Sequence, residues 1–215
     1  MKDIPMFQSE YGIASLVLKE IPYLQKAYVK IQASQDPEKL VQECLSFCRM
    51  CGAEQVYFTG HAYLERYPLY TEMWYMQICK ESLEDTEAAL WPVLPENLKH
   101  WQEIYNEKVK KVPNGAWMTD QDAKKMLEQG DGYFIHKNGK LLGIGRASDD
   151  IIDWVASVES GAGRQIVSAL THAVTQDSVR LLVASANEKA MKLYQTLGFV
   201  PTGRLSCWYH VTSEK

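Results

Sequence analysis

The N-terminal 80 residues alternate apolar and polar positions in short runs, which predicts strands around a single helix. In residues 27–32, Ala27, Val29 and Ile31 would face one side of a strand and the residues between them the other. Asp36 suits the cap position of a helix, because its carboxylate can accept hydrogen bonds from first-turn N–H groups. In chain order, the pattern predicts a strand over 15–21, a strand over 27–32, a helix from Asp36 to Gly52, and strands over 54–60 and 70–79.

The rest of the chain places helices and strands in a different order. Asn138-Gly139 between two apolar runs is typical of a two-residue hairpin turn, because both positions require positive φ. Thr119 followed three residues later by Asp122 favours a helix start. The pattern predicts, in order, a polar linker over 82–88, a strand over 90–93, helices from Pro95 to Val112 and from Thr119 to Gly130, strands over 132–137, 140–146 and 150–158, a helix after Gly163, a strand over 179–185, a helix over 187–197 and a terminal strand from Phe199 onward.

Composition narrows the class of protein. The chain has 215 residues, of which 46% are hydrophobic and 23% charged, which is enough apolar material for one large domain or two small ones. The net charge of -4 and the lack of a basic stripe argue against a nucleic-acid partner and favour cationic or neutral small substrates. The first ten residues lack the apolar run of a signal peptide, and no apolar stretch reaches membrane-spanning length. We therefore expect a cytoplasmic protein with no membrane partner.

The five cysteines do not favour a metal site. Cys44, Cys48 and Cys51 recur at helical spacing within residues 40–51, so Cys44 and Cys48 are predicted to lie on the buried stripe as small hydrophobic residues. A zinc site would need a second ligand pair at a recognised spacing, and the sequence offers none. We expect neither a bound metal nor a disulfide framework.

Two segments offer a place for a ligand. The glycines of Gly161-Ala162-Gly163 join a predicted strand to a predicted helix, where free N–H groups and the helix dipole can seat a phosphate. Such a loop is also typical of a simple tight connection between a strand and a helix. In the later helix, Tyr194 lies two turns after Asn187 on the same side, and periodicity alone is met by an ordinary capped amphipathic helix.

The spacing of these segments resembles a known family. The run Asn187-x-x-Ala190-x-x-x-Tyr194-x-x-x-Gly198-Phe199 resembles the last conserved motif of the GNAT superfamily of acetyl-CoA-dependent N-acetyltransferases. The Gly161-x-Gly163 loop, one strand earlier, resembles the superfamily's pyrophosphate loop, and the resemblance covers about residues 86–211. It implies an α/β (α+β) GNAT fold, with a central mixed twisted sheet flanked by helices.

The resemblance also implies a domain division. Residues 85–215 would form the acetyltransferase domain, and residues 1–84 a smaller N-terminal α/β region. The strand and helix order of that region resembles the central part of a GNAT domain without its motifs. It is either a degenerate second GNAT-like half or an unrelated extension. Its aromatic residues would either line an acceptor pocket or pack in a core; they are Tyr57, Phe58, Tyr63, Tyr67, Tyr70, Trp74 and Tyr75.

Site roles follow from the same resemblance. The loop would hold the pyrophosphate of acetyl-CoA, the strand before it would pair with the pantetheine arm, and Asn187 would hydrogen-bond that arm. Tyr194 would donate a proton to the departing thiolate. The implied cofactor-binding residues are Ala156, Val158, Gly161, Ala162, Gly163, Arg164, Asn187 and Tyr194.

The sequence departs from the family pattern at the start of the loop. Val158 stands where the family has Gln or Arg, and the acidic Glu159 follows it; Arg164 would compensate. For a general base we expect Asp153 on the third strand of this region. Alternatives are Asp149, Asp150, Glu159 and His136.

The expected activity is transfer of an acetyl group from acetyl-CoA to a primary amine on a small molecule or a peptide. The alternatives are an acyl-CoA-binding module without catalysis and a structural partner that assembles through its N-terminal half. A homodimer is compatible with either.

Overall fold

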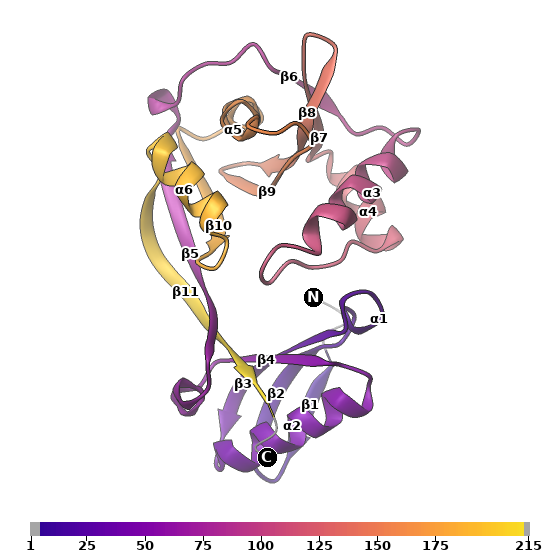
Figure 1. The fold of residues 1–215 in the computed structure, drawn as a ribbon, viewed down its shortest axis with the longest axis vertical. Helices are drawn as coiled ribbons and strands as arrows, with labels where there is room; N and C mark the ends of the chain where they lie inside the picture. The colour runs from indigo at the N-terminus through magenta and orange to yellow at the C-terminus, as the bar shows by residue number, and fades with distance from the viewer. Residues whose placement is uncertain (1–4, 213–215) are drawn as a thin grey trace. The chain divides into compact units, whose positions relative to one another are not determined.

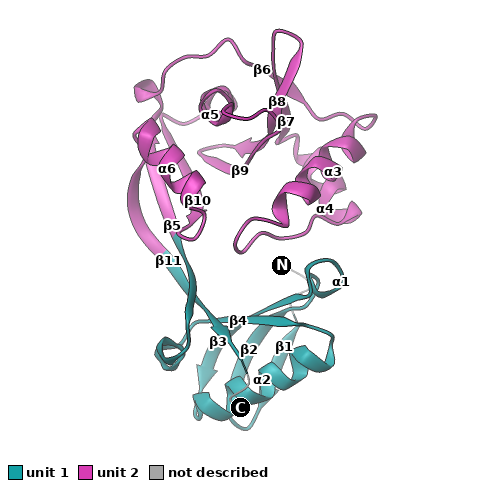
Figure 2. Ribbon diagram, viewed as in Figure 1, with its two compact units in different colours: residues 1–73, 205–215 teal, residues 74–204 magenta. Residues whose placement is uncertain are grey.

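The chain divides into two compact units in a computed structural model that describes residues 5–212 (Figures 1 and 2). Unit 1 comprises residues 1–73 and 205–215, and unit 2 comprises residues 74–204. The chain passes from one unit to the other within two strands, β5 (Leu69–Cys79) and β11 (Val200–Val211).

Unit 1 is a sheet with one long helix. Its strands lie in the order β1-β2-β3-β4-β11, and β3 and β4 are parallel while the other neighbours are antiparallel. The remaining elements of unit 1 are β1 (Met6–Ser9), β2 (Gly12–Val17), α1 (Ile21–Leu24), β3 (Lys26–Ser34), α2 (Pro37–Met50), β4 (Gln55–Thr59) and the 3₁₀ helix η1 (Ala62–Arg66).

The core of unit 1 lies between α2 and one face of this sheet. Ala27, Val29 and Ile31 of β3 are buried there, which confirms the predicted alternation. Asp36 caps α2 by accepting from Lys39 N, as predicted. Cys44 and Cys48 are fully buried in the same core, so their positions on the apolar stripe are confirmed.

The predicted aromatic cluster is divided between the two faces of the unit 1 sheet. Phe58 is a fully buried core residue. Tyr57, its neighbour on β4, points to the opposite face and stacks against Tyr28 and Tyr70, with ring centroids 5.4 and 4.0 Å apart. His210 and Trp208 of β11 extend this row of rings.

Unit 2 has strands in the order β11-β5-β10-β9-β8-β7-β6. Strands β6 to β9 are antiparallel to one another, whereas β9 and β10 are parallel because α5 connects them. The elements are η2 (Lys80–Ser82), β6 (Ala89–Pro92), α3 (Leu98–Val109), α4 (Asp120–Gln129), β7 (Gly132–Lys137), β8 (Lys140–Ser148), β9 (Ile151–Ser157), α5 (Gly163–Thr171), β10 (Ser178–Ala184) and α6 (Glu188–Leu197).

Helices cover both faces of the unit 2 sheet (Figure 1). The helix α5 packs so closely on β8 that a Cβ at Gly143 would lie 2.5 Å from Ile166 Cδ1 and 2.3 Å from the Ala156 carbonyl oxygen. The next residue on β8, Ile144, faces the other side, where α3 and α4 form a separate apolar cluster.

Local signals confirmed several boundaries. Thr119 and Asp122 form the predicted capping box, and Gly130 ends α4 in a left-handed conformation. Asn138 and Gly139 both have positive φ, as the hairpin turn requires. Asn187 caps α6 and Gly198 ends it.

Several predicted element limits were wrong. The strand expected over 15–21 is β2, which runs from Gly12 to Val17, and Ile21 begins α1. Helix α3 begins at Leu98 rather than at Pro95, because Asn97 Oδ1 accepts from Leu94 N and closes a turn before the helix. The same helix ends at Val109 rather than at Val112. The sequence reading also missed β1.

The compact units have different limits from the expected domains 1–84 and 85–215. The division falls within β5, at residues 73 and 74, rather than in the polar linker after it. The C-terminal half of β11 belongs to unit 1, because residues Tyr209 to Val211 pair with β4. A long strand hides such a division from the sequence, because neither glycine nor proline marks the point where its neighbours change.

None of the helices in the described part of the chain combines the length and hydrophobicity needed to cross a lipid bilayer.

Candidate functional site

Strands β9 and β10 pair only at their beginnings. Their ladder consists of Arg180 opposite Ile151 and Leu181 opposite Ile152, although β9 continues to Ser157 and β10 to Ala184. One edge of β9 pairs with β8 from Ile151 to Ser157. The other edge of β9 is open beyond Ile152. An open strand edge offers N–H and C=O groups to an extended ligand. Two predicted cofactor residues, Ala156 and Val158, lie at the end of this segment.

The loop after β9 leads into an uncapped helix. Gly161 has a φ of +81°, and its Cβ position is open, so this glycine is required by the backbone rather than by crowding. The N-cap residue of α5 is Ala162, which has no side-chain acceptor, and no acidic residue lies in the first turn. The first-turn N–H groups of α5 lack intrahelical acceptors, and together with the helix dipole they can seat an anion.

Gly163 has a packing role. A Cβ at this position would lie 2.8 Å from Leu193 Cδ2 on α6, so the absence of a side chain lets the start of α5 approach α6. Ala162 and Tyr194 belong to the same apolar cluster. The structure therefore brings the glycine-loop motif and the α6 motif together, as their order in the sequence implied.

Val158 differs from the expectation of a cofactor contact. Its N–H and that of Glu159 both donate to Leu142 O, at 2.9 Å each. Its side chain is exposed and apolar. Only the later N–H groups of the loop and of α5 are left for an anion.

Arg164 points toward an acidic segment that precedes β6. Its Nη1 lies 3.4 Å from Glu84 Oε2. Two further pairs hold the same segment, His172 with Asp85 and Lys137 with Glu87. We call residues 83–88 the acidic strap. A hollow of about 360 Å³ lies between it and α5, lined by Glu84, Asp85, Thr86, Glu87, Lys137, Arg164, Gln165 and Ser168.

Asn187 and Tyr194 lie on α6 as the motif requires. Asn187 Oδ1 accepts from Ala190 N at 3.3 Å, which leaves the amide NH₂ as the group able to donate to a ligand. Tyr194 is buried, and this burial raises its pKa to about 12. Its hydroxyl therefore stays protonated at physiological pH and is able to donate.

Asp153 is the extra residue of a β-bulge. On the paired strands, Arg146 lies opposite Trp154 and Ala147 lies opposite Ile152, so Asp153 has no partner. The side chain is exposed, yet its pKa is raised, mainly because neighbouring atoms shield it from water. Arg146 acts to lower the pKa and the Asp131 carboxylate acts to raise it.

The ion pair between Arg146 and Asp131, which lies near Asp153, was not predicted from the sequence. Arg146 donates to Asp131 through two bonds, Nε to Oδ1 at 2.9 Å and Nη2 to Oδ2 at 2.6 Å. Asp131 is only 5% exposed, although it carries a charge. The hairpin register indicates this pair. The Asn138-Gly139 turn, together with a bulge in the hairpin, places Gly132 opposite Arg146, so Asp131 lies next to Arg146.

The other candidate bases have different surroundings. Asp150 is paired with Arg180, which holds its pKa below the usual range. Asp149 occupies the turn before β9 with a φ of +44°. His136 lies on β7 opposite Ala89 of β6, two strands from β9, and packs against Trp91. Asp153 alone among the five candidates lies on the strand segment with the open edge.

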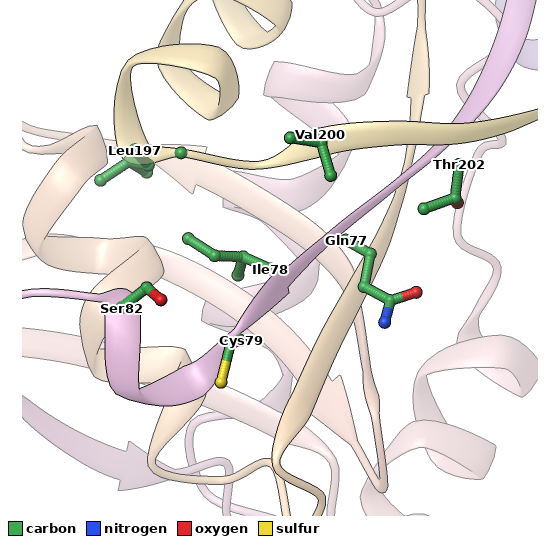
Figure 3. A pocket seen from close by; sticks show the side chains of 8 residues that line it. Gln77, Ile78, Cys79, Ser82, Leu197, Val200 and Thr202 are labelled. Carbon is green, nitrogen blue, oxygen red and sulfur yellow. The ribbon is translucent and has the colours of Figure 1, made fainter.

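A second hollow lies at the far end of α6. It measures about 390 Å³ and is lined by Gln77, Ile78, Cys79, Ser82, Leu197, Gly198, Val200 and Thr202 (Figure 3). Its lining comes from the end of β5, the C-terminus of α6 and the start of β11. Because Asn187 and the glycine loop lie toward the other end of α6, this hollow is separate from the site above. Within the described residues, no group of three or more His, Cys, Asp or Glu side chains is placed to hold a metal ion.

Neither a protein-family model nor a curated protein sequence matches this chain. Solved structures do match. A conserved protein of unknown function from Staphylococcus epidermidis has a TM-score of 0.58 at 14% identity, covering 98% of this chain and 94% of that one.

Two acetyltransferases are similar over comparable lengths. A GCN5-related N-acetyltransferase from Sphaerobacter thermophilus has a TM-score of 0.56 at 13% identity, covering 93% of this chain and 76% of that one. A GNAT-family acetyltransferase from Colwellia psychrerythraea has a TM-score of 0.54 at 14% identity, covering 96% and 84%. The chain has the GNAT fold. Identities this low establish the fold and leave activity to the site itself.

Proposed function

We propose that this protein is an N-acyltransferase that moves an acetyl group from acetyl-CoA to a primary amine of a small molecule or peptide. The observation that carries the proposal is the open edge of β9 leading directly to the uncapped start of α5. An extended amide-bearing arm followed by a pyrophosphate is a ligand whose two parts suit these two features.

The residues present fit acetyl-CoA at most points. The backbone of β9 from Asp153 to Ser157 would pair with the pantetheine amides, and the amide of Asn187 would donate to the same arm. The first-turn N–H groups of α5 would hold the pyrophosphate. Val158 and Glu159 supply no such contact, which places more of the binding on α5.

Two side chains suit the chemistry. The Asp153 carboxylate would take a proton from the attacking amine, directly or through water, as the C–N bond forms. The Tyr194 hydroxyl would donate its proton to the sulfur as the C–S bond breaks, and solvent would restore it. In total, one proton passes from nitrogen to sulfur, and the products are the N-acetyl amine and the free thiol of CoA.

Unit 1 has a comparable arrangement with one difference. Helix α2 joins the parallel strands β3 and β4, as α5 joins β9 and β10. However, the Asp36 carboxylate caps the start of α2 by accepting from Lys39 N, whereas the start of α5 has no side-chain cap. We propose that unit 1 is a degenerate GNAT-like half that holds no acetyl-CoA of its own.

A second candidate function is acyl-CoA binding without catalysis. The observation that favours it is Val158-Glu159, where an apolar and an acidic residue stand at the start of the loop. Thermal stability measured with acetyl-CoA and with CoA, followed by a thiol-release assay across a panel of amines, separates the two functions. Turnover on any primary amine supports the enzyme. Stabilisation by both thioester and thiol without turnover supports the binding module, and no stabilisation at all contradicts both.

A further inference from the structure

The bulge at Asp153 lies beside an ion pair between the buried Asp131 and the partly exposed Arg146. The guanidinium of Arg146 is planar and makes two parallel bonds to the Asp131 carboxylate, and its Nη2 also donates to Gln129 Oε1 at 3.0 Å. Ala147 N donates to Asp131 O at 3.0 Å, so the backbone at the bulge is tied to the same residue. Asp131 thus holds both the side chain of Arg146 and the backbone of Ala147 on β8. These are the two β8 residues between whose partners Asp153 is inserted.

Two charged groups act on Asp153. Arg146 of β8 is cationic and Asp131 before β7 is anionic, and the neutral hydroxyl of Tyr105 on α3 lies near Arg146. The guanidinium of Arg146 is bonded to Asp131 by two hydrogen bonds and acts on Asp153 through its charge. Arg146 therefore attracts the Asp153 carboxylate and Asp131 repels it, and the attraction is the larger of the two.

We propose that Asp131 and Arg146 are positioning residues for Asp153: the pair fixes the bulge that aims the Asp153 carboxylate and sets the charge it faces. The importance of this pair for catalysis rests on the proposed function, in which Asp153 takes the proton of the attacking amine. The pair itself touches no substrate. Its effect passes through the position and the proton affinity of the Asp153 carboxylate.

Opposite substitutions in the pair should have opposite effects. Asp131→Asn removes a repelling carboxylate and frees Arg146 to turn toward Asp153, so the pKa of Asp153 should fall. Arg146→Gln removes the attracting cation and leaves Asp131 charged, so the pKa of Asp153 should rise. Arg146→Lys keeps the charge but loses the two-bond geometry, and should return the pKa toward that of the unaltered protein.

The test is a titration of the carboxyl carbons in full-length protein labelled with ¹³C-aspartate, with Asp153 identified by its loss in Asp153→Asn. Asp150→Asn is the matched control, because it breaks an ion pair with Arg180 at the residue just before the same strand. Opposite shifts in Asp131→Asn and Arg146→Gln, with none in the control, support the proposal. Shifts in the same direction, no shift, or an equal shift in the control overturn it.

Two further measurements keep the result clear. If Asp131→Asn does not fold, the comparison of Arg146→Gln with Arg146→Lys decides the proposal by itself. If acetyl transfer is found, the acid limb of its pH–rate profile should move in the same directions as the titration. The titration needs no substrate. Failure of every amine to react would therefore contradict the proposed function, but the titration would still test whether Asp131 and Arg146 act on Asp153.

Discussion

Tyr194 is protected from water by the apolar cluster of α5 and α6, and this raises its pKa to about 12. A phenol with a raised pKa keeps its proton at neutral pH and is a weaker acid than an ordinary tyrosine, so donation from Tyr194 requires an acceptor held at hydrogen-bond distance. Asp153 differs from Tyr194, because its side chain is exposed, although partial shielding by neighbouring atoms raises its pKa. In the proposed function, Asp153 would take a proton from nitrogen and Tyr194 would give one to sulfur.

Replacing Tyr194 with Phe removes the proposed proton donor and keeps the ring that contacts Phe199. We expect turnover to fall by about 10²-fold or more, since general acid catalysis typically contributes that much. Affinity for acetyl-CoA should change little. Steady-state kinetics and calorimetric titration measure the two quantities, with Tyr133→Phe on β7 as the control. Unchanged turnover would remove Tyr194 from the mechanism.

The cysteines should differ sharply in reactivity. Cys44 and Cys48 are fully buried, and burial raises the pKa of each thiol to about 12. Cys51 and Cys79 are exposed. Alkylation of the native protein followed by peptide mass spectrometry should therefore find Cys51 and Cys79 modified and the buried pair intact. Fast modification of Cys44 would contradict the packing of α2.

At the scale of the elements, the contact between α5 and β8 positions the ligand-facing loop. Two glycines on β8, Gly143 and Gly145, let the side chains of α5 reach the strand surface. The first turn of α5 therefore follows the end of β9 after a short loop. The position of that turn depends on the absence of two Cβ atoms.

Gly143→Ala tests this contact. The new Cβ would lie 2.3 Å from the Ala156 carbonyl oxygen, which is backbone and cannot move aside cheaply. We expect a loss of about 1–3 kcal/mol, as for other overpacked positions, and a fall in Tm of roughly 2–4 °C per kcal/mol. Gly203→Ala is the control, because its Cβ position has no atom within 4 Å. Equal melting temperatures for the two variants would show that α5 packs less closely.

The acidic strap offers a test of cofactor binding. Glu84 shares the charge of Arg164, so Glu84→Gln should leave Arg164 free for a phosphate of CoA. Both side chains are exposed, so the gain should be small, up to about fivefold in affinity, and larger at low salt. Glu87→Gln, which releases Lys137 instead, is the control. Calorimetric titration with CoA at two salt concentrations measures it, and weaker binding would mean that Glu84 orients Arg164 productively.

At the scale of the whole chain, each unit has its own core. The cluster with Phe58 and α2 belongs to unit 1, and the clusters on the two faces of the β7–β9 sheet belong to unit 2. The chain passes between the two units within the strands β5 and β11. Damage to one core should therefore be felt first within its own unit.

Phe58→Ala should destabilise unit 1 by about 3–5 kcal/mol, because Phe58 is fully buried. Hydrogen exchange should rise within residues 1–73 and 205–215, while acetyl-CoA still protects residues 158–166 of unit 2. Ile166→Ala, in the unit 2 core, is the matched comparison and should reverse the pattern. Loss of cofactor protection in the folded Phe58→Ala protein would mean that unit 1 supports the cofactor site directly.

Features that depend on near neighbours in the chain could be read from the sequence. The Thr119 capping box, the Asn138-Gly139 turn and the α6 limits at Asn187 and Gly198 were all predicted and are all present. Hydrogen bonds over three or four residues, or the need for positive φ, determine each of them. The motif in α6 and its distance from the glycine loop also predicted the fold.

The tertiary structure decided what the site consists of. The point at which β9 and β10 separate and the pairing of Arg164 with Glu84 join residues that are distant in the sequence, and the insertion of Asp153 depends on the register between β8 and β9. Whether a strand edge stays open depends on how α5 packs against β8, and the charge facing Asp153 depends on the register of a hairpin. These are sums of many contacts between elements, and residue type at one position does not determine them.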